Sequence, residues 1–382
     1  MLVKSNYNFL IFLILIHFLV KIIISSLVPI SSEDLLPNNF YFVDLFTYDF
    51  NSVKDIFISI FIDNYFIESK VYIFVHSLLY HFFDSFFLNH LYEIFIHTSI
   101  VVLIFKLSKL SYITNKQLLF LYLLFPTFSF SFFYLRDSTI LLLLLYHLYY
   151  IQAQKKFSLA LLISGLIFLL VLDFRVETSL LIIAQTLVYY YYLKKEKSKN
   201  FFLFLILLFF VLIYILSLSQ DFINNLISGY NVYDTLTTER MDNTGLGSKL
   251  YNLPKPLSNI LILFFGLLNI PPWSNIGKSI NLFGEFRGFL FLFNFLFSGI
   301  LIFNVLFNFS RFRKLIKDLK LNLYLLVILF YGLASTVNFT YRRTLVLFLF
   351  VFIFWLHKGT SRKAIVAYSC FLIFYTALKF YI

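Results

Sequence analysis

Long apolar runs separated by short charged segments constrain this chain more than any other feature. A transmembrane helix needs about 20 apolar residues, because the hydrocarbon layer is about 30 Å thick and each helical residue adds about 1.5 Å. Such runs recur along all 382 residues, of which only 13% are charged, whereas about a quarter of the residues in a soluble domain are charged. The sequence therefore predicts an all-α, polytopic protein that forms one integral membrane domain over residues 1–382.

Apolar windows bounded by charged residues predict about eleven spanning helices. They lie near residues 8–30, 88–107, 117–134, 138–153, 157–173, 177–193, 200–218, 288–309, 321–337, 343–357 and 364–380. Two shorter apolar pieces, near 71–83 and 257–270, predict re-entrant or interfacial helices. No small-residue cleavage site follows the first apolar stretch, so we expect an uncleaved first span.

Basic residues predict which ends of the spans face the cytoplasm, because Lys and Arg beside a span are retained on that side. They cluster at residue 4 and near residues 106–116, 155–156, 194–199, 311–320 and 358–363. The two longest loops, near 31–70 and 219–287, then face outward, which predicts a bacterial-type inner-membrane protein. The net charge of +12 follows from this topology and is not evidence for a nucleic-acid partner.

Arginine is concentrated on the predicted outward side, against the usual bias. Six of the nine arginines fall there: Arg136, Arg175, Arg240, Arg287, Arg342 and Arg343. A guanidinium stays charged, and its planar fork matches phosphate or carboxylate oxygens. The collection favours a site that holds a lipid-linked diphosphate at the membrane surface, although each single arginine is also explained by an ion pair that anchors a helix end.

Carboxylates near these arginines are candidates for a general base, which would accept a proton from a sugar hydroxyl. Asp137, Glu177 and Glu285 each lie within two residues of an outward arginine, and Asp44 and Asp49 lie in the first outward loop. A structural role is the alternative for each of them.

Metal and cofactor chemistry has no sequence signature in this chain. Cys370 is the only cysteine, and the seven histidines lack the spacing of metal ligands, so we expect no disulfide, metal or cofactor. Lys21, which shares a helix face with His17, is a functional candidate because it interrupts a predicted span, unless its amine extends to the interface.

Several short motifs follow one another along residues 40–345. They are Phe125-Pro126-Thr127, Tyr134-Leu135-Arg136-Asp137, Asp173-Phe174-Arg175, Ile270-Pro271-Pro272-Trp273 with Glu285, and Asn338-Phe339-Thr340-Tyr341-Arg342-Arg343. In order and spacing they resemble the bacterial surface-polysaccharide repeat-unit polymerases of the Wzy and EpsG type, which make O-antigen or capsule.

The resemblance implies an inverting glycosyl transfer from one undecaprenyl diphosphate to the nonreducing-end sugar of another lipid-linked oligosaccharide. It implies that Arg136, Arg175, Arg287, Arg342, Arg343 and Asp44 bind substrate and that Asp137, Glu177 or Glu285 supplies the base. Membrane lipid and a chain-length regulator are the further partners expected.

Other functions stay open at this point. A membrane glycosyltransferase of the GT-C type, which uses a lipid-phosphate sugar, would place its base at Asp44 or Asp49. A lipid-linked oligosaccharide flippase or another transporter would place functional charges at several depths inside the bundle, where Lys21, Glu93 and His147 are candidates. A membrane protein without a ligand is the remaining alternative.

Overall fold

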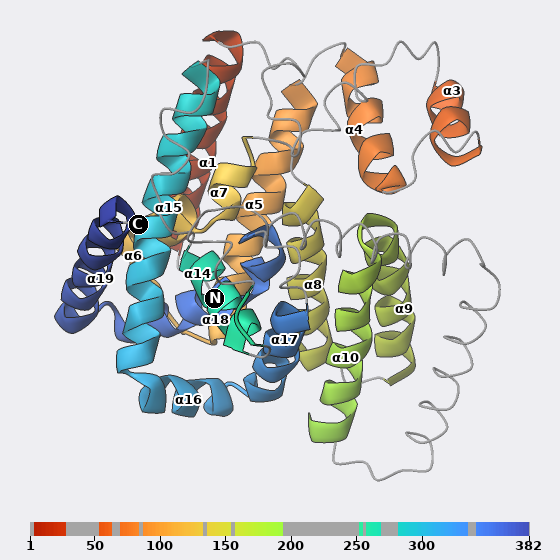
Figure 1. The fold of residues 1–382 in the computed structure, drawn as a ribbon. Coiled ribbons are helices and arrows are strands. Elements are labelled where there is room, and N and C mark those ends of the chain that lie inside the picture. Colours follow the sequence, from red (N-terminus) through yellow and green to blue (C-terminus); the bar gives the residue numbers. More distant parts are fainter. Residues whose placement is uncertain are drawn as a thin grey trace.

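The described part of the chain is all-helical, as predicted (Figure 1). The computed structural model describes residues 4–27, 53–62, 69–83, 87–132, 136–153, 157–193, 252–254, 257–268, 282–334 and 341–381, and these residues contain no strand. In the first half the helices are α1 (Lys4–Leu27), α3 (Val53–Phe57), η2 (Ile58–Ile62), α4 (Lys70–Phe83), α5 (Phe87–Ser108), α6 (Asn115–Leu124), α7 (Thr127–Phe130), α8 (Arg136–Ala153), α9 (Phe157–Phe174) and α10 (Val176–Leu193). In the second half they are α14 (Leu257–Leu268), α15 (Leu282–Phe307), α16 (Phe309–Asp318), α17 (Asn322–Ala334), α18 (Tyr341–Lys358) and α19 (Arg362–Tyr381).

Three helices among the described residues are long and apolar enough to cross a membrane. They are Asn6–Ile24 within α1, Phe87–Ser108 in α5 and Phe289–Phe307 within α15. Three further apolar segments, Leu162–Phe174, Thr178–Val188 and Leu345–Lys358, are shorter. The prediction of membrane-spanning helices is thus supported, whereas the predicted number of eleven is not confirmed, and the window near 200–218 lies outside the described residues.

Pro126 divides one predicted span. The window 117–134 was expected to be one helix, but α6 ends at Leu124 and the short α7 begins at Thr127. Phe125 is extended, with φ −70° and ψ 133°, because the ring of the following proline disfavours helical geometry at the residue before it. The two pieces expected to be too short for spans form α4, with 14 residues, and α14, with 12 residues.

The faces of α1 are arranged as in a protein surrounded by lipid. Ile11, Leu15 and Leu19 are 55%, 55% and 57% exposed, whereas His17 and Lys21 are buried. Water would favour the opposite arrangement, with apolar side chains inside and charged ones outside. The same inversion occurs on α9, where Leu166 is exposed and Ser164 is buried, so both helices favour a membrane around the bundle.

Helix α18 lies in the centre of the bundle and connects its two ends. Its residues 345–350 and 352–356 are all buried and belong to a hydrophobic core shared with α5, α8 and α15. Its last turn is tied to the end of α5, since His357 Nε2 lies 2.8 Å from the Ser108 carbonyl oxygen. Its first turns reach the other end of the bundle, where the outward arginines are predicted.

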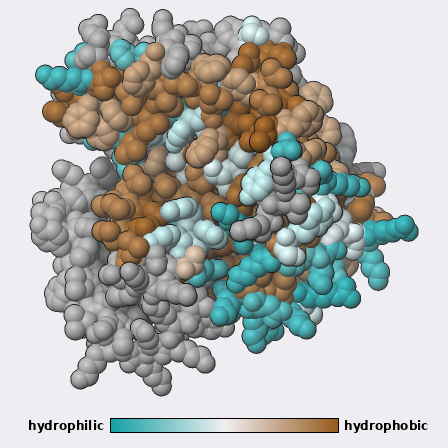
Figure 2. All heavy atoms as spheres, turned by 180° about the vertical axis from the view of Figure 1, so that it is seen from behind, coloured by the Kyte–Doolittle hydropathy of each residue, from teal (hydrophilic) through white to brown (hydrophobic). Residues whose placement is uncertain are grey.

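Helix α16 runs across the lower end of the bundle, whereas α15 runs along it (Figure 1). Phe312 and Ile316 of α16 are buried, and the Phe312 ring packs edge-on against Phe354 of α18 with 5.6 Å between ring centroids. Its basic side chains are exposed, and Figure 2 shows hydrophilic side chains gathered over this helix and over the turn between α18 and α19.

Candidate functional site

An ion pair between Arg175 and Asp137 forms the centre of the candidate site. Arg175 is the single residue between α9 and α10: its N–H donates to Val171 of α9 at 2.8 Å, and its carbonyl accepts from Thr178 of α10 at 3.2 Å. This tight turn directs the guanidinium toward α8, where Nη2 lies 2.9 Å from Asp137 Oδ1. The Arg175 side chain is 12% exposed and that of Asp137 is 2% exposed, so the pair is largely removed from solvent.

The start of α8 also favours a negative charge at this position. Asp137 lies in the first turn of α8, where unpaired backbone N–H groups give the helix end a partial positive charge. Arg175 and the helix dipole therefore both stabilise the Asp137 carboxylate.

Arg136, the neighbouring residue, makes a different contact. Its Nη1 donates a hydrogen bond to Ser69 Oγ just before α4, and Ser69 has a positive φ of 63°. The Ser69 N–H donates to the Asp173 carbonyl at 2.8 Å, which holds this segment against the end of α9. Arg136 and Arg175 are thus brought to the same end of the bundle by α8, α9 and the segment before α4.

Asp173 and Arg175 have separate tasks although one residue lies between them. Asp173 Oδ2 accepts from the Val71 N–H at 2.9 Å, and Oδ1 accepts from the Lys70 N–H at 3.2 Å, so this carboxylate caps the N-terminus of α4. Asp173 and Arg175, which belong to one short sequence motif, therefore have different partners: Asp173 caps α4, and Arg175 pairs with Asp137 of α8.

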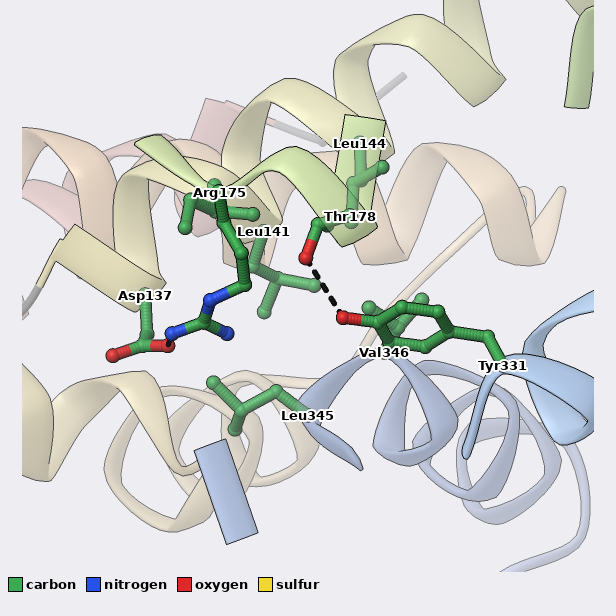
Figure 3. Close-up of a pocket in the computed structure, with 9 residues that line it drawn as sticks. Asp137, Leu141, Leu144, Arg175, Thr178, Tyr331, Leu345 and Val346 are labelled. Atoms are coloured by element: carbon green, nitrogen blue, oxygen red, sulfur yellow. Dashed lines mark hydrogen bonds and ion pairs between the residues drawn. The ribbon is translucent and has the colours of Figure 1, made fainter. Parts of the chain in front are cut away.

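A small cavity adjoins the ion pair (Figure 3). Asp137 and Arg175 line one side of it, and Thr178 Oγ1 and Tyr331 Oη lie 2.8 Å apart on another. Apolar side chains of α8 and α18 complete the wall: Ile140, Leu141, Leu144, Leu345 and Val346. Its volume of about 10 Å³ for water-sized spheres accommodates one water, so a diphosphate does not fit inside it.

The other predicted site residues are only partly described. Glu177 lies in the first turn of α10, Glu285 and Arg287 lie in the first turns of α15, and Arg342 and Arg343 lie in the first turn of α18. Their side chains, together with Asp44, lie outside the described residues. Because Leu345 lines the cavity, the helical turn that carries Arg342 and Arg343 adjoins it.

A polar cluster inside the bundle was only partly found from the sequence. The Tyr72 hydroxyl of α4 donates to Glu93 Oε1 of α5 at 2.7 Å, and His76 Nε2 lies 3.2 Å from the same oxygen. Lys21 of α1 interacts electrostatically with Glu93, and its Nζ donates to the Ser131 carbonyl. All four of these side chains are at most 1% exposed.

Hydrogen bonds continue from this cluster between α1, α5, α6 and the segment of α7. His17 Nε2 lies 2.9 Å from Ser131 Oγ and His17 Nδ1 lies 3.0 Å from Tyr122 Oη, while His97 Nδ1 lies 2.8 Å from Thr127 Oγ1. A sequence signal for its members on α1, α4 and α5 is polar residues four apart on apolar helices, at 17 and 21, at 72 and 76, and at 89, 93 and 97.

His147, a third buried candidate, is satisfied by neighbouring helices. Its Nδ1 lies 2.7 Å from Gln185 Oε1 of α10, and its Nε2 lies 2.8 Å from Ser164 Oγ of α9. Both ring nitrogens have protein partners, which fits a role in holding α8, α9 and α10 together. Among the described side chains, no group of three or more His, Cys, Asp or Glu could hold a metal ion.

The fold and the site define an all-α membrane protein with a buried ion pair at one end of its bundle. No family model, curated protein or solved structure matches the chain.

Proposed function

We propose that this protein polymerises undecaprenyl-diphosphate-linked oligosaccharide repeat units into a surface polysaccharide, O-antigen or capsule, at the outer face of the inner membrane. The observation that carries the proposal is the meeting of Arg136, Arg175 and Asp137 at one end of the bundle, beside the first turn of α18. Two permanent cations next to a carboxylate combine the groups needed to neutralise a diphosphate and to accept a proton.

In the proposed reaction, the acceptor hydroxyl oxygen attacks the anomeric carbon of the donor sugar from the face opposite the diphosphate. The hydroxyl proton passes to the Asp137 carboxylate. The bond between the anomeric carbon and the diphosphate oxygen breaks, and undecaprenyl diphosphate leaves with the bonding electrons. Arg175 binds the diphosphate on the outward side of the small cavity, and this contact replaces its bond to Asp137 and frees the carboxylate to act as base.

Complementation of a strain that lacks the chain tests the proposal. The double variant Arg175→Ala and Arg342→Ala is expected to abolish long polymer while single repeat units still reach the cell surface. Arg175→Lys is the matched control, because it keeps the positive charge but loses the planar guanidinium. Cells with this variant should still make part of the long polymer. Lys54→Ala, which removes an exposed cation on α3, should leave polymer length unchanged. Full-length polymer from the double variant, inserted at normal level, would overturn the arginine mechanism.

Transport of a lipid-linked oligosaccharide is a second candidate, favoured by the buried Lys21–Glu93 cluster. Ionisable residues inside spans often mark a transport path, and these two lie within two of the three helices that could cross a membrane. Purified protein in liposomes distinguishes the functions: a polymerase converts lipid-linked units into longer glycans, whereas a flippase changes the leaflet in which unaltered units are found. The GT-C alternative rests on Asp44 and Asp49, which lie outside the described residues.

A further inference from the structure

Helix α16 begins where a membrane-crossing helix ends. The apolar segment of α15 that could span a membrane ends at Phe307, and α16 starts at Phe309 with only Asn308 between them. Leu306, Phe307 and Phe309 are each more than half exposed. Exposed aromatic and aliphatic side chains at the end of a span are suited to the boundary between acyl chains and headgroups.

The two faces of α16 differ sharply. Phe312, Ile316 and the following Leu319 are buried against the bundle. The opposite face carries five exposed cations on and just after the helix, Arg311, Arg313, Lys314, Lys317 and Lys320, against a single carboxylate, Asp318. A helix with one face this strongly charged is not suited to crossing a membrane, and α16 runs across the end of the bundle (Figure 1).

These five cations are not paired with a carboxylate among the described residues. None of their side chains forms a hydrogen bond or an ion pair with the described residues. Only their backbone groups form hydrogen bonds there. Because their side chains are exposed, they can contact anions outside the protein, and no salt bridge within the described part of the chain accounts for them.

Neighbouring segments add positive charge at the same end. Asn304 Nδ2 of α15 donates to the Gly359 carbonyl at 2.9 Å, and Gln117 Nε2 of α6 donates to the Leu356 carbonyl at 3.1 Å, so the ends of α15, α18 and the start of α6 lie together. The end of α5 joins them through the contact of His357 with the Ser108 carbonyl oxygen. Further exposed cations in these segments are Lys106, Lys109, Lys116, Lys358, Arg362 and Lys363. Figure 2 shows a large group of hydrophilic side chains in the lower right of the view.

We propose that α16 is an interfacial helix that binds the phosphate groups of anionic phospholipids. Its apolar face is held by the protein, its cations lie in the headgroup layer, and the exposed Phe307 and Phe309 reach the acyl chains. The occupant is a lipid headgroup and not a free phosphate or a nucleic acid, because apolar side chains border the cations and α15 places them at the depth of the interface. The proposal does not depend on the proposed polymerase activity.

Retention of lipid by the purified full chain tests this proposal. The protein in detergent micelles is titrated with phosphatidylglycerol or with phosphatidylcholine, and bound lipid is counted by native mass spectrometry. The chain should retain phosphatidylglycerol preferentially. The variant Arg311→Gln, Lys314→Gln, Lys317→Gln should lose that preference, by about fivefold in affinity for each charge removed near an anionic surface.

A matched pair of single variants controls for general loss of charge. Lys314→Gln on α16 should weaken phosphatidylglycerol binding, whereas Lys54→Gln, which removes another exposed lysine on α3, should not. Equal retention of the two lipids by the unaltered chain would overturn the proposal, and so would an unchanged preference in the triple variant. Displacement of the bound lipid by inorganic phosphate alone would assign the site to a free anion and also contradict it.

Discussion

Arg175 Nη2 lies 2.9 Å from Asp137 Oδ1, and this pair joins the α9–α10 turn to the first turn of α8. Removing one partner of a buried ion pair leaves the other charge without compensation, whereas replacing both by apolar side chains is often neutral. We therefore expect Asp137→Ala to lower the free energy of unfolding by about 3 kcal/mol and the double variant Asp137→Leu, Arg175→Met to recover most of that loss. Chemical unfolding in detergent micelles measures both, and simply additive losses would show that the pair is not coupled.

The same double variant separates stability from the proposed activity. If Asp137 and Arg175 take part in glycosyl transfer, Asp137→Leu, Arg175→Met is expected to be stable and to make no long polymer. Polymer length in the complemented strain is the measurement. Normal polymer from this stable variant would restrict the pair to a structural role.

Asp173 provides a second, local prediction, because its carboxylate caps α4. Asp173→Ala removes the acceptor for the Lys70 and Val71 N–H groups and should lower stability by about 1 kcal/mol. Hydrogen exchange should accelerate at the first turn of α4 and not at α8. Asp318→Ala, which removes an exposed carboxylate on α16, is the control and should leave α4 exchange unchanged.

Close packing of α15 on α19 depends on Gly299. A Cβ added there would overlap the ring of Tyr368, which is 1% exposed and cannot move into open space. Gly299→Ala is expected to cost about 1–3 kcal/mol of unfolding free energy. Tyr368→Leu in the same chain should recover part of the loss. Gly165→Ala, where nothing lies within 4 Å of the added atom, should not destabilise the protein.

Cysteine labelling tests the predicted orientation, since Cys370 is the only native cysteine. In a Cys370→Ser background, Lys314→Cys on α16 should react with an impermeant reagent only from the cytoplasmic side. Lys54→Cys on α3 should react only from the outside. The reverse pattern would place the arginine end in the cytoplasm and contradict the proposed polymerase.

Local sequence was sufficient to predict the helical class and the membrane, because both depend on apolar runs and on the scarcity of charge. It also contained, in Pro126, the reason why the window 117–134 is divided, although the prediction overlooked it. Lys21 and Glu93 were identified as charges within spans, but their proximity was not, since a helical period places residues on a face without saying which helix that face meets.

Tertiary structure decided which charged side chains contact one another. The sequence grouped Asp173 with Arg175 because they are two residues apart. In the structure α9 ends between them, so Asp173 contacts α4 and Arg175 contacts α8. Likewise, the sequence identified residues 311–320 as a basic loop, and only the packing of Phe312 and Ile316 against the bundle makes that segment a surface helix with its cations outward. Composition and periodicity determine what surrounds a helix, whereas the contacts between distant helices determine which charges meet.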